Sequence, residues 1–253
     1  MGLAAAVGEF SAIHFTAAKQ IIRRSIQISA ACTLFGGLTL CGNINFQFAQ
    51  LFFDISSGII TGAFFQFCIA RLILPFIMGN GFCSRACWDG AVFETIDTRG
   101  YRVEKPAKRN ELVAFAYLCF LVSIPVALFC ILGPGVGDRY GRFWSIGENI
   151  IILSFGILGS RILGSRIYCR TLCPFLTVSG MISRYSVFKI TPQASNPCSG
   201  CGECNRNCPM LIDVRSFALS GTRINDRSCI LCERCADGCR KKSLRLAPDF
   251  PWK

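Results

Sequence analysis

The chain has 253 residues, of which 52% are hydrophobic and 17% are charged, and its formal net charge is +12. This balance, with a mean hydropathy of +0.45, excludes an ordinary water-soluble domain and predicts a membrane protein. The basic residues flank apolar runs and are not interleaved with aromatic platforms, which argues against nucleic acid as a partner.

Residues 1–20 are the first predicted element, a helix that lies in the membrane interface. At helical spacing, Phe10, Ile13, His14 and Ala17 share one face. His14 is the only histidine, so a b-type haem held by two histidines of this chain is excluded. His14 is a candidate quinone contact, although an ordinary interfacial histidine is the simpler interpretation.

Four apolar segments predict membrane-spanning helices. Such a helix needs roughly 20 mostly apolar residues, because its backbone polar groups must be satisfied internally within the hydrocarbon core. The segments are residues 25–44, 58–78, 112–132 and 143–163. We therefore predict an α-helical membrane protein whose four transmembrane helices form a domain over residues 21–190.

The positions of lysine and arginine predict how these spans are oriented. The basic residues concentrate before the first span, between the second and third spans, and after the fourth. Residues 45–57 hold none, and residues 133–142 hold only Arg139 and Arg142. Both termini and the loop over residues 79–111 are therefore expected on the cytoplasmic side of the cell inner membrane.

Two charged residues inside the predicted spans are candidate quinone contacts, because ionisable side chains are costly there and often functional. Arg71 lies in the cytoplasmic half of the second span. It either snorkels to the interface, which is the simpler interpretation, or contacts a metal cluster or a quinone carbonyl. Glu148 lies about one turn inside the fourth span, where it either accepts a proton from a quinol or reaches water.

A short motif recurs at the cytoplasmic ends of the second and fourth spans. In both copies an aromatic residue precedes Cys-x3-Cys, with Cys83 and Cys87 in the first and Cys169 and Cys173 in the second. Because residues four apart share one face of a helix, the two pairs could supply four thiolates to one iron-sulfur or other metal centre. Free thiols and a dithiol/disulfide couple are the alternatives.

Cysteine spacing predicts two clusters in residues 191–253. Two runs of Cys-x2-Cys-x2-Cys-x3-Cys, the first followed by Pro209, match the bacterial two-cluster ferredoxin, in which the fourth cysteine of each run binds the other cluster. Paired zinc knuckles are the alternative, but the x3 step and the proline favour iron. The predicted ligands are Cys198, Cys201, Cys204 and Cys239 for one 4Fe-4S cluster, and Cys229, Cys232, Cys235 and Cys208 for the other.

Together these motifs resemble the NapH/NosR/MauN family of polyferredoxin-type membrane proteins, over about residues 20–245. The sequence departs from that family at Trp88, where a proline usually follows the second cysteine, so the geometry of the first motif is less determined. The resemblance implies electron transfer from membrane quinol to partner redox proteins, or support for the maturation of a partner enzyme.

We therefore expect four transmembrane helices, a C-terminal ferredoxin-like α+β domain, and the role of an electron-transfer subunit in a quinol-linked oxidoreductase complex. The expected cofactors are two 4Fe-4S clusters, the further centre and a quinone. The expected partners are the lipid bilayer and other redox subunits. Two other functions remain open: an accessory factor that supplies electrons for metal-centre assembly in another enzyme, and a passive membrane anchor.

Overall fold

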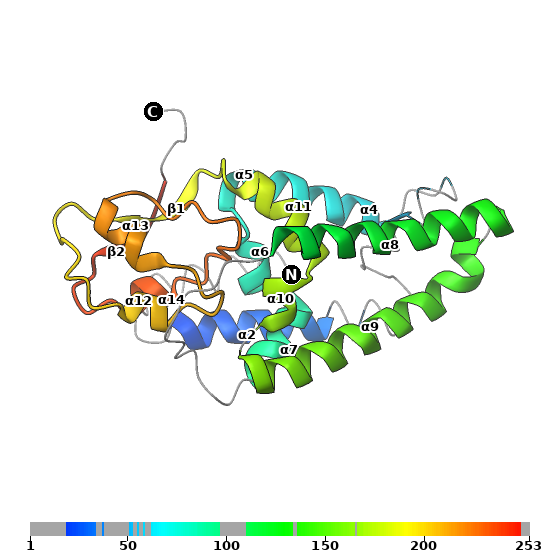
Figure 1. The fold of residues 1–253 in the computed structure, drawn as a ribbon, viewed down its shortest axis with the longest axis horizontal. Helices are drawn as coiled ribbons and strands as arrows, with labels where there is room; N and C mark the ends of the chain where they lie inside the picture. The colour runs from blue at the N-terminus through cyan, green and yellow to red at the C-terminus, as the bar shows by residue number, and fades with distance from the viewer. Residues whose placement is uncertain are drawn as a thin grey trace.

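The computed structural model describes residues 19–33, 37, 51–52, 55, 58, 62–96, 110–133, 136–164 and 166–248. The helix predicted over residues 1–20, His14 included, lies outside these residues except for its last two, as does much of the first predicted span. The described elements form an elongated molecule, with the C-terminal strands at one end of its long axis and the tips of α8 and α9 at the other (Figure 1).

The helices α8 (Glu111–Leu132) and α9 (Val136–Leu163) contain the third and fourth predicted spans. Asn110 caps α8, because its side-chain oxygen accepts hydrogen bonds from the backbone N–H groups of Leu112 (3.1 Å) and Val113 (3.3 Å). Both helices are long and apolar enough to cross a membrane, and only 11% of the apolar window of α8 is buried within the molecule. Exposed apolar surface of this kind suits contact with lipid.

Three consecutive helical segments cover the second predicted span: α4 (Gly62–Phe67), the π-helix η3 (Cys68–Ile73) and α5 (Leu74–Met78). Pro75 lacks a backbone N–H group and so cannot donate the regular bond to the preceding turn. The wider π-helical turn lies immediately before it. Arg71 is therefore in a segment whose side-chain directions differ from those of a regular α-helix.

The helix α2 (Lys19–Ala31) crosses the predicted boundary between the interfacial helix and the first span. It packs against the short helices α6 (Gly81–Arg85) and α7 (Trp88–Ile96). The face of α2 that meets them buries Arg23 and Gln27. The polar side chains of Arg23 and Gln27 therefore lie inside the molecule, between α2 and the short helices.

A second pair of short helices, α10 (Ile167–Thr171) and α11 (Pro174–Ser183), follows α9 and repeats the arrangement of α6 and α7. In each pair, a helix of five residues is followed after a two-residue break by a longer one. The helix α9 contacts both α7 and α10, so the two pairs are held close together.

The C-terminal segment begins with strand β1 (Phe188–Pro192) and ends with strand β2 (Leu244–Pro248). The two strands pair in antiparallel fashion, with Ile190 opposite Leu246. Between them lie three short helices: α12 (Glu203–Arg206), α13 (Val214–Ser220) and α14 (Arg234–Asp237). The core under the strands is apolar, and Ile190, Val214 and Ile224 are each only 1% exposed.

The two cysteine runs of this segment have the same backbone conformation. Positive φ angles occur at equivalent places: at Gly200 and Leu231, two residues after the first cysteine of each run, and at Gly202 and Glu233, four residues after it. Residues with side chains rarely adopt this region, so Leu231 and Glu233 are held there by their surroundings. The second run thus repeats the first despite having no glycine at these positions.

Candidate iron-sulfur site

The two Cys-x3-Cys motifs have closely matching hydrogen bonds. In both, the N–H groups of the last two residues donate to the carbonyl of the leading aromatic residue: Ala86 and Cys87 to Phe82 (2.9 and 3.1 Å), and Leu172 and Cys173 to Tyr168 (2.9 and 3.0 Å). The next helix begins at Trp88 in the first copy and at Pro174 in the second. Trp88 therefore takes the place of a proline at a helix start without changing the motif.

The prediction that each cysteine pair lies on one face of a helical turn is wrong. α6 ends at Arg85 and α10 ends at Thr171, so Cys87 and Cys173 both lie beyond the helix that carries the first cysteine. Cys173 has φ −50° and ψ 114°, because the residue before a proline is pushed out of the α-helical region. Each motif therefore spans a break between two helices.

All four cysteines of these motifs nevertheless gather in one place. Cys169 is within electrostatic reach of the other three thiols, and Cys87 is within reach of Cys83 and Cys173. Cys83 and Cys169 are each 8% exposed. The structure thus brings together the four side chains predicted for the third centre.

Burial makes this a poor place for bare thiolates. It raises the pKa of Cys87 to about 12, with a further contribution from the negative charge of Asp89. Burial likewise raises the pKa of Cys169 well above its usual value. Thiols buried in this way lose their protons when cations such as iron replace them, and thiolates are the ligands of iron-sulfur clusters, so a set of four cysteines fits such a cluster.

Arg71 does not snorkel, which corrects the simpler interpretation of its position. It is only 6% exposed, and its Nη1 atom donates a hydrogen bond of 3.4 Å to Cys83 Sγ. The guanidinium contacts the rings of both Phe82 and Phe175, with its carbon 4.4 and 4.3 Å from their centroids. The physical reason is that two aromatic faces and a sulfur acceptor replace the water that a snorkelling side chain would seek.

In the C-terminal segment, one cavity is lined by Cys208, Cys229, Cys232 and Cys235 together with apolar side chains. Cys235 is within electrostatic reach of the other three thiols. Burial raises the pKa of Cys208 and of Cys229 to about 12. Cys208, the last cysteine of the first run, thus lies with the first three cysteines of the second run, and these four thiols form the donor set of a cluster held in this way.

The other predicted set is more open to solvent. Cys204 is buried and within electrostatic reach of Cys198 and Cys201, and Cys201 is exposed. The fourth member, Cys239, accepts a long hydrogen bond (3.4 Å) from the Ser243 N–H group. Ser243 in turn donates to the carbonyl of Pro197, next to Cys198. This set also has the thiol donors that a cluster needs.

Among the described residues, no three or more Cys, His, Asp or Glu side chains are close enough to hold a single metal ion. In a cubane each thiolate binds a different iron, so its ligands are spread around a larger body than a single ion.

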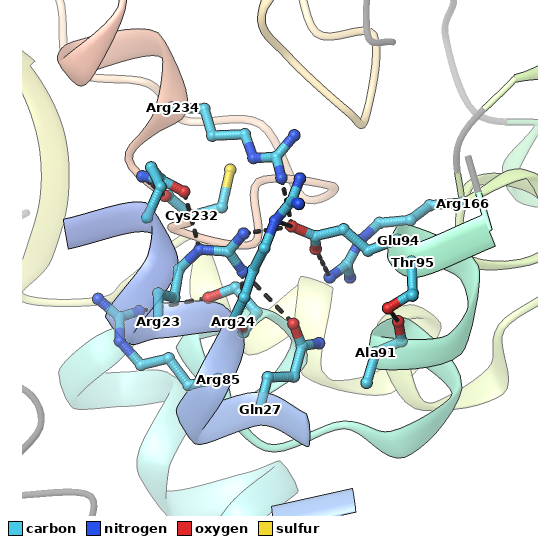
Figure 2. A network of polar contacts seen from close by, with 12 residues as sticks. Arg23, Arg24, Gln27, Arg85, Ala91, Glu94, Thr95, Arg166, Cys232 and Arg234 are labelled. Atoms are coloured by element: carbon cyan, nitrogen blue, oxygen red, sulfur yellow. Dashed lines mark hydrogen bonds and ion pairs between the residues drawn. The ribbon is translucent and has the colours of Figure 1, made fainter. Parts of the chain in front are cut away.

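A network of charged side chains centres on Glu94 of α7, which is 5% exposed (Figure 2). Its carboxylate pairs with four arginines: Arg23 and Arg24 of α2, Arg166 before α10, and Arg234 of the C-terminal segment. Although burial opposes ionisation, the charges of Arg166, Arg23 and Arg234 lower the pKa of Glu94 to about 2. Glu94 therefore stays ionised and joins four segments.

A second link joins the first Cys-x3-Cys motif to the C-terminal segment. Arg85, which lies between Cys83 and Cys87, donates to the carbonyl of Leu231 (3.1 Å) and pairs with Glu233 (2.9 Å). Leu231 and Glu233 flank Cys232. The cluster cavity of Cys232 is thus directly connected to the four-thiol site.

Glu148, a predicted quinone contact, lies inside α9 and is 7% exposed. Its Oε2 atom and Oδ1 of Asp89 have no hydrogen-bond partner within the described part of the chain. The interpretation that Glu148 reaches water is therefore wrong, because α9 begins several residues before the predicted span and carries Glu148 away from its end. Tyr117 lies within electrostatic reach of Glu148, and its ring contacts Tyr168.

The sequence did not single out Glu94, Asp89 or Arg166. From the sequence, the positions of Arg23, Arg24 and Arg166 are explained by membrane topology. In the structure, however, all three form ion pairs with the Glu94 carboxylate. The available signal was the presence of Asp89 and Glu94 in an otherwise apolar stretch, directly after a cysteine motif in a basic loop.

Comparison with known proteins identifies two segments of one family. Residues 60–105 and 147–192 match the family model described as a 4Fe-4S binding domain. The first segment contains Cys83 and Cys87 and the second contains Cys169 and Cys173, whereas the eight ferredoxin cysteines lie outside both. No solved structure matches the chain.

Three relatives are similar over parts of their length. An uncharacterised protein of Methanocaldococcus jannaschii is 26% identical over 71% of this chain and 69% of its own. YccM of Escherichia coli, whose name proposes an electron transport role, is 24% identical over 81% of this chain and 60% of its own. The methylamine utilization ferredoxin-type protein MauN of Methylobacillus flagellatus is 30% identical over 34% of this chain and 27% of its own.

Each matched segment contains one of the two repeated helix pairs, and the names of two relatives refer to electron transport and to a ferredoxin-type protein. The predicted resemblance is therefore confirmed: the chain is similar to polyferredoxin-like 4Fe-4S proteins.

Proposed function

We propose that this chain is a membrane-bound subunit that relays electrons between the quinone pool and a partner redox protein. The observation that carries the proposal is the gathering of four thiols from two repeated motifs, directly connected through Arg85 to the cavity of Cys232. An anchor without redox function has no need of such an arrangement. The iron-sulfur and electron-transport character of the relatives supports the same role.

The proposal includes four membrane-spanning helices with all the cysteine motifs on the cytoplasmic side. The lengths and exposed apolar faces of α8 and α9 support two of these spans, and the helical run over residues 62–78 supports a third. The basic loops support the orientation. The partner is a redox subunit that meets the cytoplasmic face.

Bound 4Fe-4S clusters would each accept and release one electron at a time. Oxidation of a quinol releases two electrons and two protons, so it requires two successive one-electron transfers. Glu148 is the proposed acceptor of one proton, because its buried carboxylate has an unpartnered oxygen among the described residues and lies in the same region as Tyr117 and Asp89. The second proton passes to water.

Metal analysis of the intact protein, purified anaerobically in lipid nanodiscs, tests this proposal. Three clusters correspond to about twelve irons per chain. Cys83→Ser and Cys173→Ser are each expected to remove about four irons while leaving the C-terminal clusters and their low-temperature spectra intact. Cys119→Ser, in an exposed position on α8, is the matched control and retains all the iron.

Zinc in place of iron would contradict the proposal. So would unchanged iron content in both motif variants, and failure of an added quinol to reduce the clusters of the wild-type protein.

A further inference from the structure

Arg71 is a buried cation held at the four-thiol site by a specific arrangement of π-helix and rings. The side chains of Ile69 and Ile73 are each 55% exposed, whereas Arg71 is 6% exposed and turned into the molecule. All three belong to the π-helix η3. Such helices are rare and often occur at functional sites. The geometry thus turns a positive charge into the molecule from a segment in which Ile69 and Ile73 face outward.

The two aromatic rings leave the guanidinium few directions in which to form hydrogen bonds. One ring, Phe82, is the leading aromatic residue of the first motif, and the other, Phe175, lies on α11 two residues after the second motif; their centroids are 4.4 and 4.3 Å from the guanidinium carbon. One of its N–H groups donates to Cys83 Sγ at 3.4 Å.

The ionisable side chains that interact with Arg71 are mainly thiols. The thiols of Cys83, Cys87 and Cys173 are within its electrostatic reach. Asp89 interacts electrostatically with Arg71, but no Asp or Glu of the described residues forms a direct ion pair with Arg71. A buried cation without a carboxylate partner is costly, so the anion that balances it is expected to be at the thiols.

We propose that Arg71 is a positioning residue that raises the reduction potential of the centre held by Cys83, Cys87, Cys169 and Cys173. A cluster with four thiolates is an anion, and reduction adds one more negative charge. A fixed guanidinium and an N–H···S hydrogen bond stabilise the reduced state more than the oxidised state. This inference rests on the proposed function, because it requires a cluster at these cysteines.

A redox titration followed by low-temperature electron paramagnetic resonance tests the inference on the full chain in nanodiscs. Arg71→Gln is expected to lower the equilibrium constant for reduction of this centre at least tenfold, which for one electron corresponds to about 59 mV. Arg71→Lys keeps the charge and is expected to shift it less. The C-terminal clusters serve as an internal standard and stay unchanged.

Arg161→Gln, which removes an exposed cation from the last turn of α9, is the matched control and is expected to leave the potential unchanged. The inference is overturned if Arg71→Gln retains its iron and the wild-type potential, or if Arg71→Lys shifts the potential as far as Arg71→Gln. If Arg71→Gln loses the centre, Arg71→Lys decides: a potential near wild type supports the inference, and a large fall contradicts it. A wild-type protein with only about eight irons would instead refute the proposed function.

Discussion

At the residue scale, Glu94 is where distant parts of the chain meet. Its partners Arg23 and Arg234 are 71 and 140 positions away in the sequence. Their side chains are 5% and 10% exposed, so the charges are largely withdrawn from water. Removing one member of a buried ion cluster leaves the others uncompensated, which is costly.

Glu94→Gln is therefore expected to destabilise the protein by about 3 kcal/mol at pH 7, since the carboxyl pKa falls from 4.5 to about 2 on folding. A lowered pKa stabilises the fold above the unfolded value. The difference from wild type should thus be constant from about pH 8 to pH 5 and should shrink only as the pH falls below about 4.5. Thermal unfolding of both proteins in nanodiscs at several pH values measures this difference in stability.

Glu111→Gln is the control for this variant, because Glu111 is an exposed carboxylate in the first turn of α8. Its expected effect is below about 1 kcal/mol. Equal losses in the two variants would show that the arginines around Glu94 do not depend on its charge.

At the scale of elements, the contact between α7 and α9 depends on a glycine. A Cβ atom at Gly156 would lie 2.0 Å from a ring carbon of Phe93, which is fully buried. A small residue here lets the two helices approach closely, and Phe93 fills the space.

Gly156→Ala is accordingly expected to cost about 1–3 kcal/mol through overpacking. Gly147, on the same helix, has open space where its Cβ would be. Gly147→Ala is therefore expected to be neutral or to stabilise by up to about 1 kcal/mol through helix propensity. Unfolding midpoints of the two variants in nanodiscs measure the contrast, and a neutral Gly156→Ala would show that α9 is not closely packed on α7.

Local sequence patterns predicted the bounds of a helix well where hydrophobicity alone determined them. Continuous apolar residues located α8 nearly to its ends, because this helix is apolar along almost its whole length. The same criterion placed the start of α9 seven residues late, at 143 instead of Val136. The hydropathy criterion excludes the charged residues Asp138 and Arg139 from the span, but the backbone of α9 is helical through both of them. The break between Cys83 and Cys87 was missed because spacing alone does not show where a helix ends.

At the scale of the whole molecule, cysteine spacing pointed to thiols that the structure places near one another, namely the four of the Cys-x3-Cys motifs and Cys208 with the first three cysteines of the second run. That each group binds a cluster, and that Cys239 joins the remaining set, stay predictions. The partners of those thiols could not be foreseen. Arg71 reaches Cys83 through a π-helix that no sequence pattern announced, and Arg85 reaches Glu233 across 148 positions. Long-range charge pairs of this kind depend on tertiary packing, which a single sequence does not display.

The arrangement also orders the three sites along the molecule. The four-thiol site connects through Arg85 to residues that flank Cys232. Cys204 lies within reach of Cys235, so the remaining set adjoins the cavity of Cys232. Cys201 of that set is exposed. Under the proposed function, electrons from the membrane would thus pass the site of Cys232 before they reach the surface at Cys201.

This order predicts different consequences for removing either C-terminal cluster. In Cys232→Ser, an added quinol is expected to reduce the membrane-edge centre while the cluster at Cys201 stays oxidised, although dithionite still reduces it directly. In Cys198→Ser, quinol should still reduce both remaining centres, because the lost cluster lies beyond them. Rapid freezing after anaerobic mixing, followed by low-temperature electron paramagnetic resonance, distinguishes the centres. Reduction of the cluster at Cys201 at the wild-type rate in Cys232→Ser would show that electrons take another path.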